Sequence, residues 1–146
     1  RKWEETGEDV PISAIYHLAR KFNIEFTEIL TGTAAKLDTY QIVRKGQGKE
    51  VDRYPGYYYE DLAWRYTGKI MQPLLVVLHP SDEPAKLVTH SGQEFNLVVK
   101  GTVIVNWCDK EFVLNEGDCI YFNPTYPHGQ RCGGNEEARF VTFIAE

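Results

Sequence analysis

The stretch that decides the fold is His90-Ser91-Gly92-Gln93-Glu94-Phe95-Asn96-Leu97-Val98-Val99-Lys100-Gly101. Strand-like residues run from Glu94 to Lys100, and the alternation of side chains along a strand places Glu94, Asn96 and Val98 on one face. His90 lies before this strand, across a short turn. A His and a Glu arranged in this way can converge on one ion, because the Glu stands at the head of the strand and points inward.

Similar short strands are predicted on both sides of this stretch, separated by Gly, Pro, Asn and Asp. Strands at such short intervals predict an all-β sandwich or barrel. Tyr40–Val43, followed by a turn over Lys45–Gly48, predicts an earlier strand and hairpin after a short linker. The predicted strands of the barrel are Tyr57–Tyr66, Gln72–His79, Glu94–Lys100, Thr102–Cys108, Lys110–Leu114, Cys119–Phe122 and Ala138–Ala145.

Composition limits the kind of protein. The 146 residues suffice for one compact domain and at most a fragment of a second. Sixteen basic against 21 acidic side chains give a net charge of −5, the wrong sign for a chain that binds nucleic acid over its whole surface. Three cysteines without Cys-x-x-Cys spacing suit reduced thiols in a cytoplasmic protein. The apolar stretches are too short to cross a bilayer, so we expect no membrane partner.

The first part of the chain is predicted to be helical. Residues 11–22 place Ile12, Ile15, Leu18, Ala19 and Phe22 at helical spacing, and a shorter helix is expected around residues 27–30, ending at Gly32. Two helices of this size cannot bury their apolar faces alone. We therefore expect a helical partner upstream of Arg1.

The order of residues in this segment, Lys2-Trp3-Glu4, Gly7, Pro11, Leu18-Ala19, Phe22 and Ile29-Leu30, resembles the end of the lambda-repressor-like (XRE) helix-turn-helix domain. The resemblance covers residues 1–32 and implies that the recognition helix precedes Arg1. The full-length protein would then bind DNA, whereas this fragment, with four basic and six acidic side chains in residues 1–32, would not. The alternative is a generic helical hairpin that packs on the barrel.

A second segment, Gly117-Asp118, Pro124 and Pro127-His128, supplies another His after a turn stiffened by proline. Together with residues 90–101 it resembles the two motifs of the cupin family, over about residues 68–146. The resemblance implies a double-stranded β-helix, or jelly-roll barrel, with His90, Glu94 and His128 as metal ligands. Two positions depart from the motifs: Val88 stands where the first motif has another His, and Cys132 where the second has Asn.

The expected domains are therefore the end of an incomplete helix-turn-helix domain in residues 1–32, a linker and first hairpin in residues 33–56, and a cupin barrel in residues 57–146. Two His and one carboxylate suit non-haem Fe(II), and the same set could hold Zn, Ni, Mn or Co. This reduced triad, joined to a helix-turn-helix domain, also resembles the hydroxypropylphosphonate epoxidase family of iron enzymes. The alternative is a metal-free pocket in which Glu94 is salt-bridged. His17 and His79 are interpreted as structural or surface residues.

The pocket is expected to contain Tyr59, Asn96, Tyr121 and Tyr126 as ligand-binding residues. Tyr59 belongs to an aromatic run, Tyr57–Trp64, whose phenols could bind a polar ligand; cross-strand packing or a dimer seam is the alternative. Asn96 would share the interior face with Glu94, as a ligand contact or as a satisfied interior amide. Cys119 and Cys132 are interpreted as small apolar fillers. No arrangement of Ser, His and Asp, and no phosphate loop, stands out, so no catalytic residue is assigned.

Three functions remain open. The first is a homodimeric transcriptional regulator in which a small-molecule effector, with a divalent metal ion, changes the affinity of the helical domains for DNA. The second is a mononuclear non-haem iron enzyme, similar to an oxidase or epoxidase, that retains a helix-turn-helix domain. The third is a metal-free binding module whose tyrosine-rich strand mediates assembly.

Overall fold

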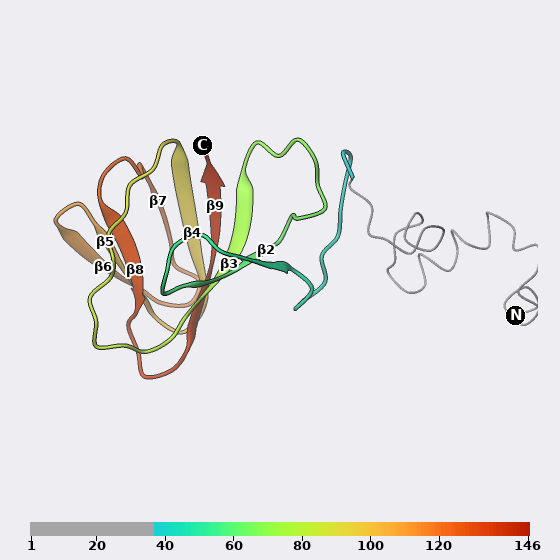
Figure 1. The fold of residues 1–146 in the computed structure, drawn as a ribbon. Helices are drawn as coiled ribbons and strands as arrows, with labels where there is room; N and C mark the ends of the chain where they lie inside the picture. The colour runs from blue at the N-terminus through green and yellow to red at the C-terminus, as the bar shows by residue number, and fades with distance from the viewer. Residues whose placement is uncertain (1–36) are drawn as a thin grey trace, which may run out of the picture. The chain divides into compact units, whose positions relative to one another are not determined.

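The computed structural model of the protein describes residues 37–146, and these fold into β-strands joined by turns and loops (Figure 1). None of the elements in this range is a helix long and apolar enough to cross a membrane. The two predicted helices of residues 1–32 lie outside the described residues. The strands are β1 (Lys49–Val51), β2 (Tyr58–Asp61), β3 (Gln72–Leu78), β4 (Gln93–Lys100), β5 (Val103–Trp107), β6 (Lys110–Leu114), β7 (Cys119–Phe122), β8 (His128–Cys132) and β9 (Ala138–Ala145).

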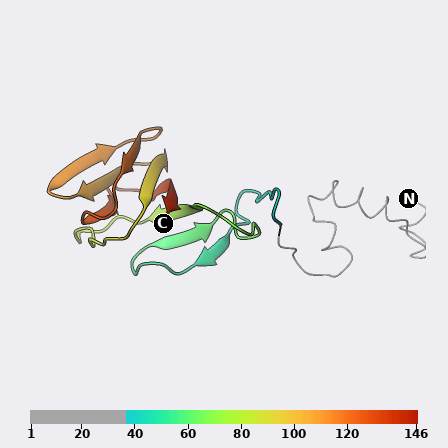
Figure 2. The same cartoon turned by 90° about the horizontal axis from the view of Figure 1, so that it is seen from above.

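The strands form two antiparallel sheets. One has six strands in the order β1-β2-β3-β9-β4-β7, and the other has three in the order β6-β5-β8. The last strand, β9, thus pairs with both β3 and β4 at the centre of the larger sheet, as Figure 1 shows near the C-terminus. Seen from above in Figure 2, the hairpin of β1 and β2 (teal to green) lies on the opposite side of the strands from β6 (orange). The fold is mainly β, as the strand pattern predicts.

The two inner faces meet in an apolar core. Along β9 every second residue is buried, which is the period expected of a strand with one face on the core. The same alternation in β4 buries Glu94, Asn96 and Val98, as predicted. The core cluster consists of Tyr59, Leu74, Val76, Leu78, Val98, Val103, Val105, Cys132, Ala138, Phe140 and Ile144.

Several predicted strands have the observed bounds, because strong β-formers alternate within them and turns close them. Residues 110–114, 119–122 and 138–145 match β6, β7 and β9. The ends of β3, β4 and β5 differ from the prediction by one residue.

The prediction was wrong at the start of the barrel. No strand forms over Tyr40–Val43. A turn follows, in which the Gln47 amide donates to the Arg44 carbonyl, and the first strand, β1, begins after it and pairs with β2. The long strand predicted over Tyr57–Tyr66 is only β2, because a turn begins directly after Asp61, where the Asp61 carboxylate accepts a hydrogen bond from the Ala63 amide. Strand β8 was missed, since His-Gly-Gln-Arg-Cys lacks β-branched and aromatic residues.

The chain divides into two compact units. All nine strands belong to the unit made of Gln41–Trp64 and Gly68–Glu146. The other unit includes Arg65–Thr67, and in it Leu37 and Tyr66 form an isolated parallel bridge.

Candidate metal centre

Three side chains from separate parts of the barrel meet at one point. His90 lies in the loop before β4, Glu94 lies in β4, and His128 is the first residue of β8. Their ligand atoms, one from each residue, all lie within 4.8 Å of one another. The side chains of His90, Glu94 and His128 are 9%, 5% and 2% exposed, so the cluster is shielded from water.

A glycine allows the turn between His90 and Glu94. Gly92 has a φ of 90°, a conformation that L side chains rarely adopt. A Cβ atom there would lie 1.6 Å from the carbonyl oxygen of Ala145 at the end of β9. The turn can therefore approach β9 closely only with glycine, and this approach places His90 beside the head of β4.

The loop that carries His90 is tied to the segment that carries His128. Val88 and His128 form an isolated antiparallel bridge, with backbone hydrogen bonds of 2.8 and 3.0 Å. The amide of His90 also donates to the carbonyl of Pro124, at 3.0 Å. Backbone bonding thus holds both imidazoles, which are 38 residues apart in the sequence, at a fixed separation.

Hydrogen bonds to the backbone determine which ring nitrogen of each His is available. The Nδ1 of His90 lies 3.0 Å from the carbonyl oxygen of Ser91, and the Nδ1 of His128 lies 3.0 Å from that of Tyr126. A carbonyl oxygen only accepts, so both Nδ1 atoms must carry the proton. The lone pairs of both Nε2 atoms are therefore the ones free to bind a proton or a metal ion.

Both Nε2 atoms face the same carboxylate oxygen. The Oε1 of Glu94 lies 2.9 Å from the Nε2 of His90 and 3.6 Å from that of His128. Burial on its own raises the pKa of Glu94, but the His128 and His90 imidazoles that face the carboxylate outweigh it and lower the pKa to about 2. The hydrogen bond to Glu94 in turn raises the pKa of His90. Glu94 is therefore ionised at neutral pH, as a metal ligand must be.

The second oxygen of Glu94 is held by a side chain from β8. The amide nitrogen of Gln130 donates to Oε2 of Glu94 at 3.1 Å, and the Tyr57 hydroxyl donates to the backbone carbonyl of Gln130 at 3.0 Å. Burial raises the pKa of the Tyr57 phenol, so it remains a proton donor. Gln130 thereby orients the carboxylate, as outer partners of metal ligands do.

These distances fit a single ion. Two ligand atoms that bind one ion at right angles, each about 2.1 Å from it, lie about 3 Å apart. The separations of 2.9 and 3.6 Å are close to that value. The donor set of two imidazoles and one carboxylate on one face suits a mononuclear divalent metal with open coordination positions. The His/Glu/His cluster could therefore hold a metal ion.

The three residues of the cluster line a small cavity inside the barrel. The free space is about 20 Å³, enough for about one water molecule. Side chains of the segment that connects β1 and β2, among them Arg53 and Tyr54, form part of its wall. The complete lining is Arg53, Tyr54, Tyr57, Tyr59, Val76, Val88, His90, Glu94, His128, Gln130, Phe140, Thr142 and Ile144.

The four predicted ligand-binding residues fall into two groups. Tyr59 is 6% exposed and lines the cavity, and Asn96 is 1% exposed on the same face of β4 as Glu94. Tyr121 and Tyr126 are 65% and 48% exposed and lie outside the lining. Tyr121 pairs with Phe95, whose face of β4 is opposite to that of Glu94, and the Tyr126 ring contacts Trp107.

Among the residues interpreted as fillers, Cys132 is buried in the core, but Cys119 is exposed. That interpretation of Cys119 was wrong, because its register partner is Leu97, on the face of β4 that points away from the metal centre. All three cysteines are free, and His79 is exposed.

Sequence reasoning missed Gln130, Thr142 and Arg53 as neighbours of the centre. For Thr142 the sequence did give an indication. It lies in β9 two residues from Phe140 and two from Ile144, and residues two apart on a strand share a face, so Thr142 must face the interior as they do. Gln130 could have been found once His128 was placed on a strand, because residues two apart share a face. Arg53 lies in a connecting segment, and no pattern in the sequence marks it.

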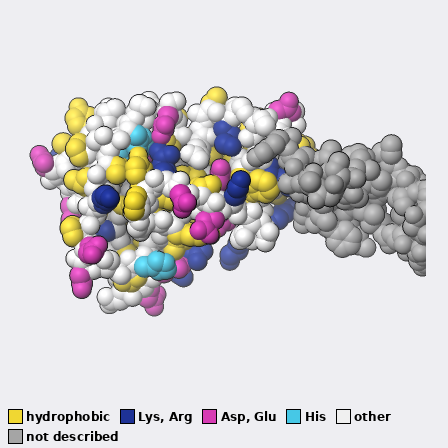
Figure 3. All heavy atoms as spheres, in the orientation of Figure 1, with side chains coloured by type: hydrophobic (Ala, Val, Ile, Leu, Met, Phe, Trp, Pro, Cys, Tyr) yellow, Lys and Arg dark blue, Asp and Glu magenta, His cyan; other side chains and the backbone are white. Residues whose placement is uncertain are grey.

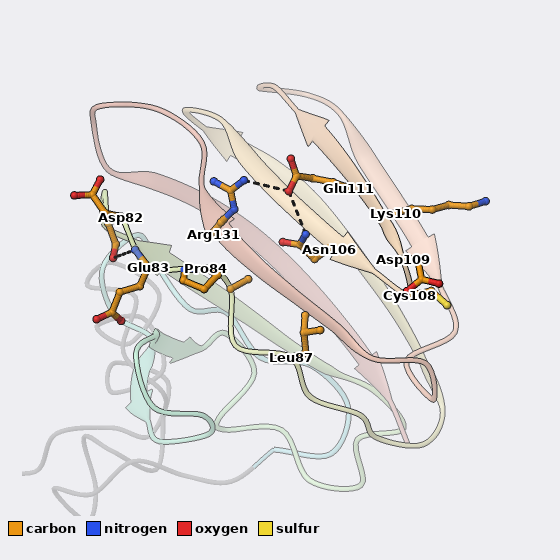
Figure 4. A pocket seen from close by; sticks show the side chains of 12 residues that line it. Asp82, Glu83, Pro84, Leu87, Asn106, Cys108, Asp109, Lys110, Glu111 and Arg131 are labelled. Carbon is orange, nitrogen blue, oxygen red and sulfur yellow. Dashed lines mark hydrogen bonds and ion pairs between the residues drawn. The ribbon is translucent and has the colours of Figure 1, made fainter.

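A larger hollow of the barrel unit lies elsewhere. It measures about 720 Å³ and is formed by the loop before β4 and the hairpin of β5 and β6 (Figure 4). Arg131 and Asn106 both contact the Glu111 carboxylate there, on the outer face of the smaller sheet. None of the three candidate ligands lines this hollow, so it is not part of the metal centre.

Charges are mixed on the face of the barrel that Figure 3 shows. Acidic and basic side chains alternate there, with hydrophobic side chains between them. This face offers no continuous basic surface of the kind that binds nucleic acid.

Comparison with known proteins assigns the fold. Residues 74–144 match the family model of the cupin domain, and the strands described above cover that range. The chain therefore contains a cupin domain with the jelly-roll strand pattern. The predicted cupin fold is confirmed, and the helix-turn-helix resemblance of residues 1–32 stays a prediction.

Solved structures support the same assignment. Hydroxypropylphosphonic acid epoxidase from S. wedmorenis aligns over 94% of this chain and 76% of its own, with a TM-score of 0.64 and 22% identity. The Fe(II) form of that enzyme with the alternative substrate (S)-1-HPP aligns with a TM-score of 0.63 and 21% identity, over 94% of this chain and 77% of its own. An RmlC-like cupin from Shewanella frigidimarina NCIMB 400 aligns over 73% of this chain and 91% of its own, with a TM-score of 0.60 and 18% identity. At these identities the likeness establishes the fold.

Proposed function

We propose that the cupin domain binds one divalent metal ion through His90, Glu94 and His128, and binds a small organic ligand at the coordination positions that these residues leave open. The observation that carries the proposal is the convergence of two Nε2 atoms, each freed by an Nδ1 hydrogen bond to the backbone, on one ionised and buried carboxylate. Desolvation opposes the charge of a buried carboxylate, so positively charged or hydrogen-bonding groups must lie close to it. A bound metal ion would meet this requirement.

The cavity residues define what the ligand meets. Val76, Phe140 and Ile144 supply an apolar wall. Tyr59 contributes a phenol whose pKa is raised by burial, so it stays protonated and can donate a hydrogen bond. A ligand larger than a water molecule would displace the half-buried side chains of Arg53 and Tyr54 between β1 and β2.

We propose ligand sensing in a transcriptional regulator as the role of this binding. The resemblance of residues 1–32 to a helix-turn-helix domain supports it, and DNA would be bound by the full-length protein as a homodimer in the cytoplasm. An effector can change DNA affinity only if it binds one dimer geometry more tightly than the other.

The second candidate is a non-haem iron oxidoreductase. It is favoured by the donor set, which suits Fe(II), and by the structural likeness to an epoxidase whose structures include an Fe(II) form. A bound Fe(II) would supply redox chemistry toward oxygen. The chain's own residues would hold the carboxylate in place (Gln130), donate a hydrogen bond to the substrate (Tyr59) and exclude water from the buried centre.

The metal can be tested directly. Protein freed of metal and then loaded with Co(II) is expected to retain about one ion per chain, measured by elemental mass spectrometry after gel filtration. His128→Ala should lose the ion, whereas His79→Ala, which changes an exposed His, should keep it. Failure of the unaltered chain to retain Co(II), Zn, Ni or Fe(II), or retention by His128→Ala, would refute the proposal.

The two roles make different demands on the recognition helix that the resemblance implies. A recognition helix with Arg, Lys, Gln or Asn on its exposed face favours regulation, whereas an acidic or degenerate helix favours an enzyme that keeps the domain as a scaffold. DNA binding by the full-length protein that weakens steeply with salt would support the regulator. Absence of any DNA binding, together with oxygen consumption by the Fe(II)-loaded protein, would support the enzyme.

A further inference from the structure

Two polar side chains face each other inside the barrel without belonging to the metal centre. Asn96 of β4 and Thr142 of β9 are register partners on adjacent strands. They are 1% and 2% exposed. Each therefore lies on the interior face of the larger sheet, where the neighbouring positions are mostly apolar.

Neither side chain is satisfied by the protein. Both the nitrogen and the oxygen of the Asn96 amide, and the hydroxyl of Thr142, lack a hydrogen-bond partner among residues 37–146. Their register partners on the strands beyond them are apolar: Ile120 beside Asn96, and Leu74 beside Thr142. Polar groups buried in this way destabilise a fold unless something else binds them.

The pair lies next to the candidate metal centre. Thr142 lines the same cavity as His90, Glu94 and His128. Asn96 follows Glu94 by two residues on the same face of β4, a step of about 7 Å along the strand. One atom of a ligand could therefore bind the metal while a second atom, about three bonds further along the same ligand, reaches Asn96 and Thr142.

The chemistry of the pair determines the group that it selects. A carboxamide and a hydroxyl each donate and accept hydrogen bonds, and neither carries charge. A buried charge would find no counter-charge in either of them, whereas a hydroxyl, carbonyl or carboxamide would be satisfied by both. We propose that Asn96 and Thr142 form a specificity site for an uncharged hydrogen-bonding group at the end of the ligand that the metal holds. This inference rests on the proposed metal and ligand binding.

The test uses the whole chain loaded with Co(II), whose visible absorption changes when a ligand coordinates. Three hydroxy acids serve as probes: glycolate, which has no tail, and 2,4-dihydroxybutanoate and 2-hydroxypentanoate, which differ by a hydroxyl in place of a methyl group at the end of the tail. We expect the unaltered chain to bind the dihydroxy acid about tenfold more tightly than 2-hydroxypentanoate, the equivalent of one or two hydrogen bonds. Thr142→Val and Asn96→Leu should abolish this preference, so that each variant binds the two tailed probes equally.

A second measurement separates a specificity site from a structural one. If the pair serves the ligand, Thr142→Val in the metal-free protein should raise Tm by about 2 °C or more, because an unsatisfied buried hydroxyl is removed without loss of volume. The exposed control Thr39→Val should change neither Tm nor the probe preference. A fall in Tm in Thr142→Val would instead assign the pair to the core and overturn the inference.

The outcomes distinguish this inference from the proposal on which it rests. If Co(II) and glycolate bind but the two tailed probes bind equally, or if the preference survives in both variants, the specificity site is refuted and the metal centre stands. If Co(II) is not retained, the metal centre is refuted and the specificity site with it.

Discussion

Replacement of Glu94 by Gln tests whether the buried carboxylate is held by the two imidazoles. In the folded, metal-free protein, the His128 and His90 imidazoles that face the carboxylate outweigh the effect of burial and lower its pKa from 4.5 to about 2. A group whose pKa is lower in the folded state stabilises the fold when it is ionised. That contribution is fully present above about pH 4.5 and is lost as the pH falls through about 2.

The size of the effect follows from the shift. Each pKa unit corresponds to about 1.36 kcal/mol, so a fall from 4.5 to about 2 corresponds to about 3 kcal/mol. Because Glu94 is only 4% exposed, solvent screening reduces this value little. We expect the free energy of unfolding of the metal-free chain to fall by about 3 kcal/mol more than that of Glu94→Gln between about pH 5 and about pH 2.

The measurement is chemical denaturation of the two metal-free proteins at a series of pH values. Glu116→Gln, which changes an exposed carboxylate in the turn before β7, serves as the matched control and should follow the unaltered chain. An identical pH dependence in the chain and in Glu94→Gln would show that the imidazoles do not hold the carboxylate, and the reasoning would fail.

Four further predictions concern the ligands and the turn that positions them. Gln130→Leu removes the hydrogen bond to Oε2 of Glu94 and should weaken Co(II) binding about 10- to 100-fold in an equilibrium titration; unchanged affinity would exclude the orienting role. Val88→His places a fourth donor beside the bridge to His128 and should tighten Co(II) binding while weakening glycolate binding, since it fills an open position. Co(II) affinity should fall as the pH drops through the raised pKa of His90, because protons then occupy Nε2, and a pH-independent affinity would contradict this. Gly92→Ala should abolish folding or lower Tm by more than 10 °C, whereas Gly134→Ala, with open space around the added methyl group, should be tolerated; circular dichroism decides between these outcomes.

The sequence carried more information about the strands than about their partners. Alternation within β4 and β9 predicts which side chains face inward, because the two-residue period is a local property of an extended chain. The same local reasoning failed for β8, whose strand is formed by pairing with β5 and by the bridge at Val88. It also overextended β2, where the Asp61 side chain turns the backbone.

The candidate ligands could be named from the spacing of two motifs, since a turn and a strand head bring His90 and Glu94 together locally. Three features of the site could not be predicted in this way: the tautomers of the two imidazoles, the support of Glu94 by Gln130, and the exposure of Tyr121. Each of them depends on the tertiary structure around the residue.

By itself the sequence determined the fold class, the inward faces of most strands and the three residues that could hold a metal ion, because periodicity, turns and motif spacing are written along the chain. Only the tertiary structure decided that Asn96 pairs with Thr142, that Tyr59 lines the cavity while Tyr126 does not, and that the hollow of about 720 Å³ lies away from the candidate ligands. The physical reason is that sheet register sets these neighbours. Register follows from the packing of all strands together, and a single strand's pattern cannot contain it.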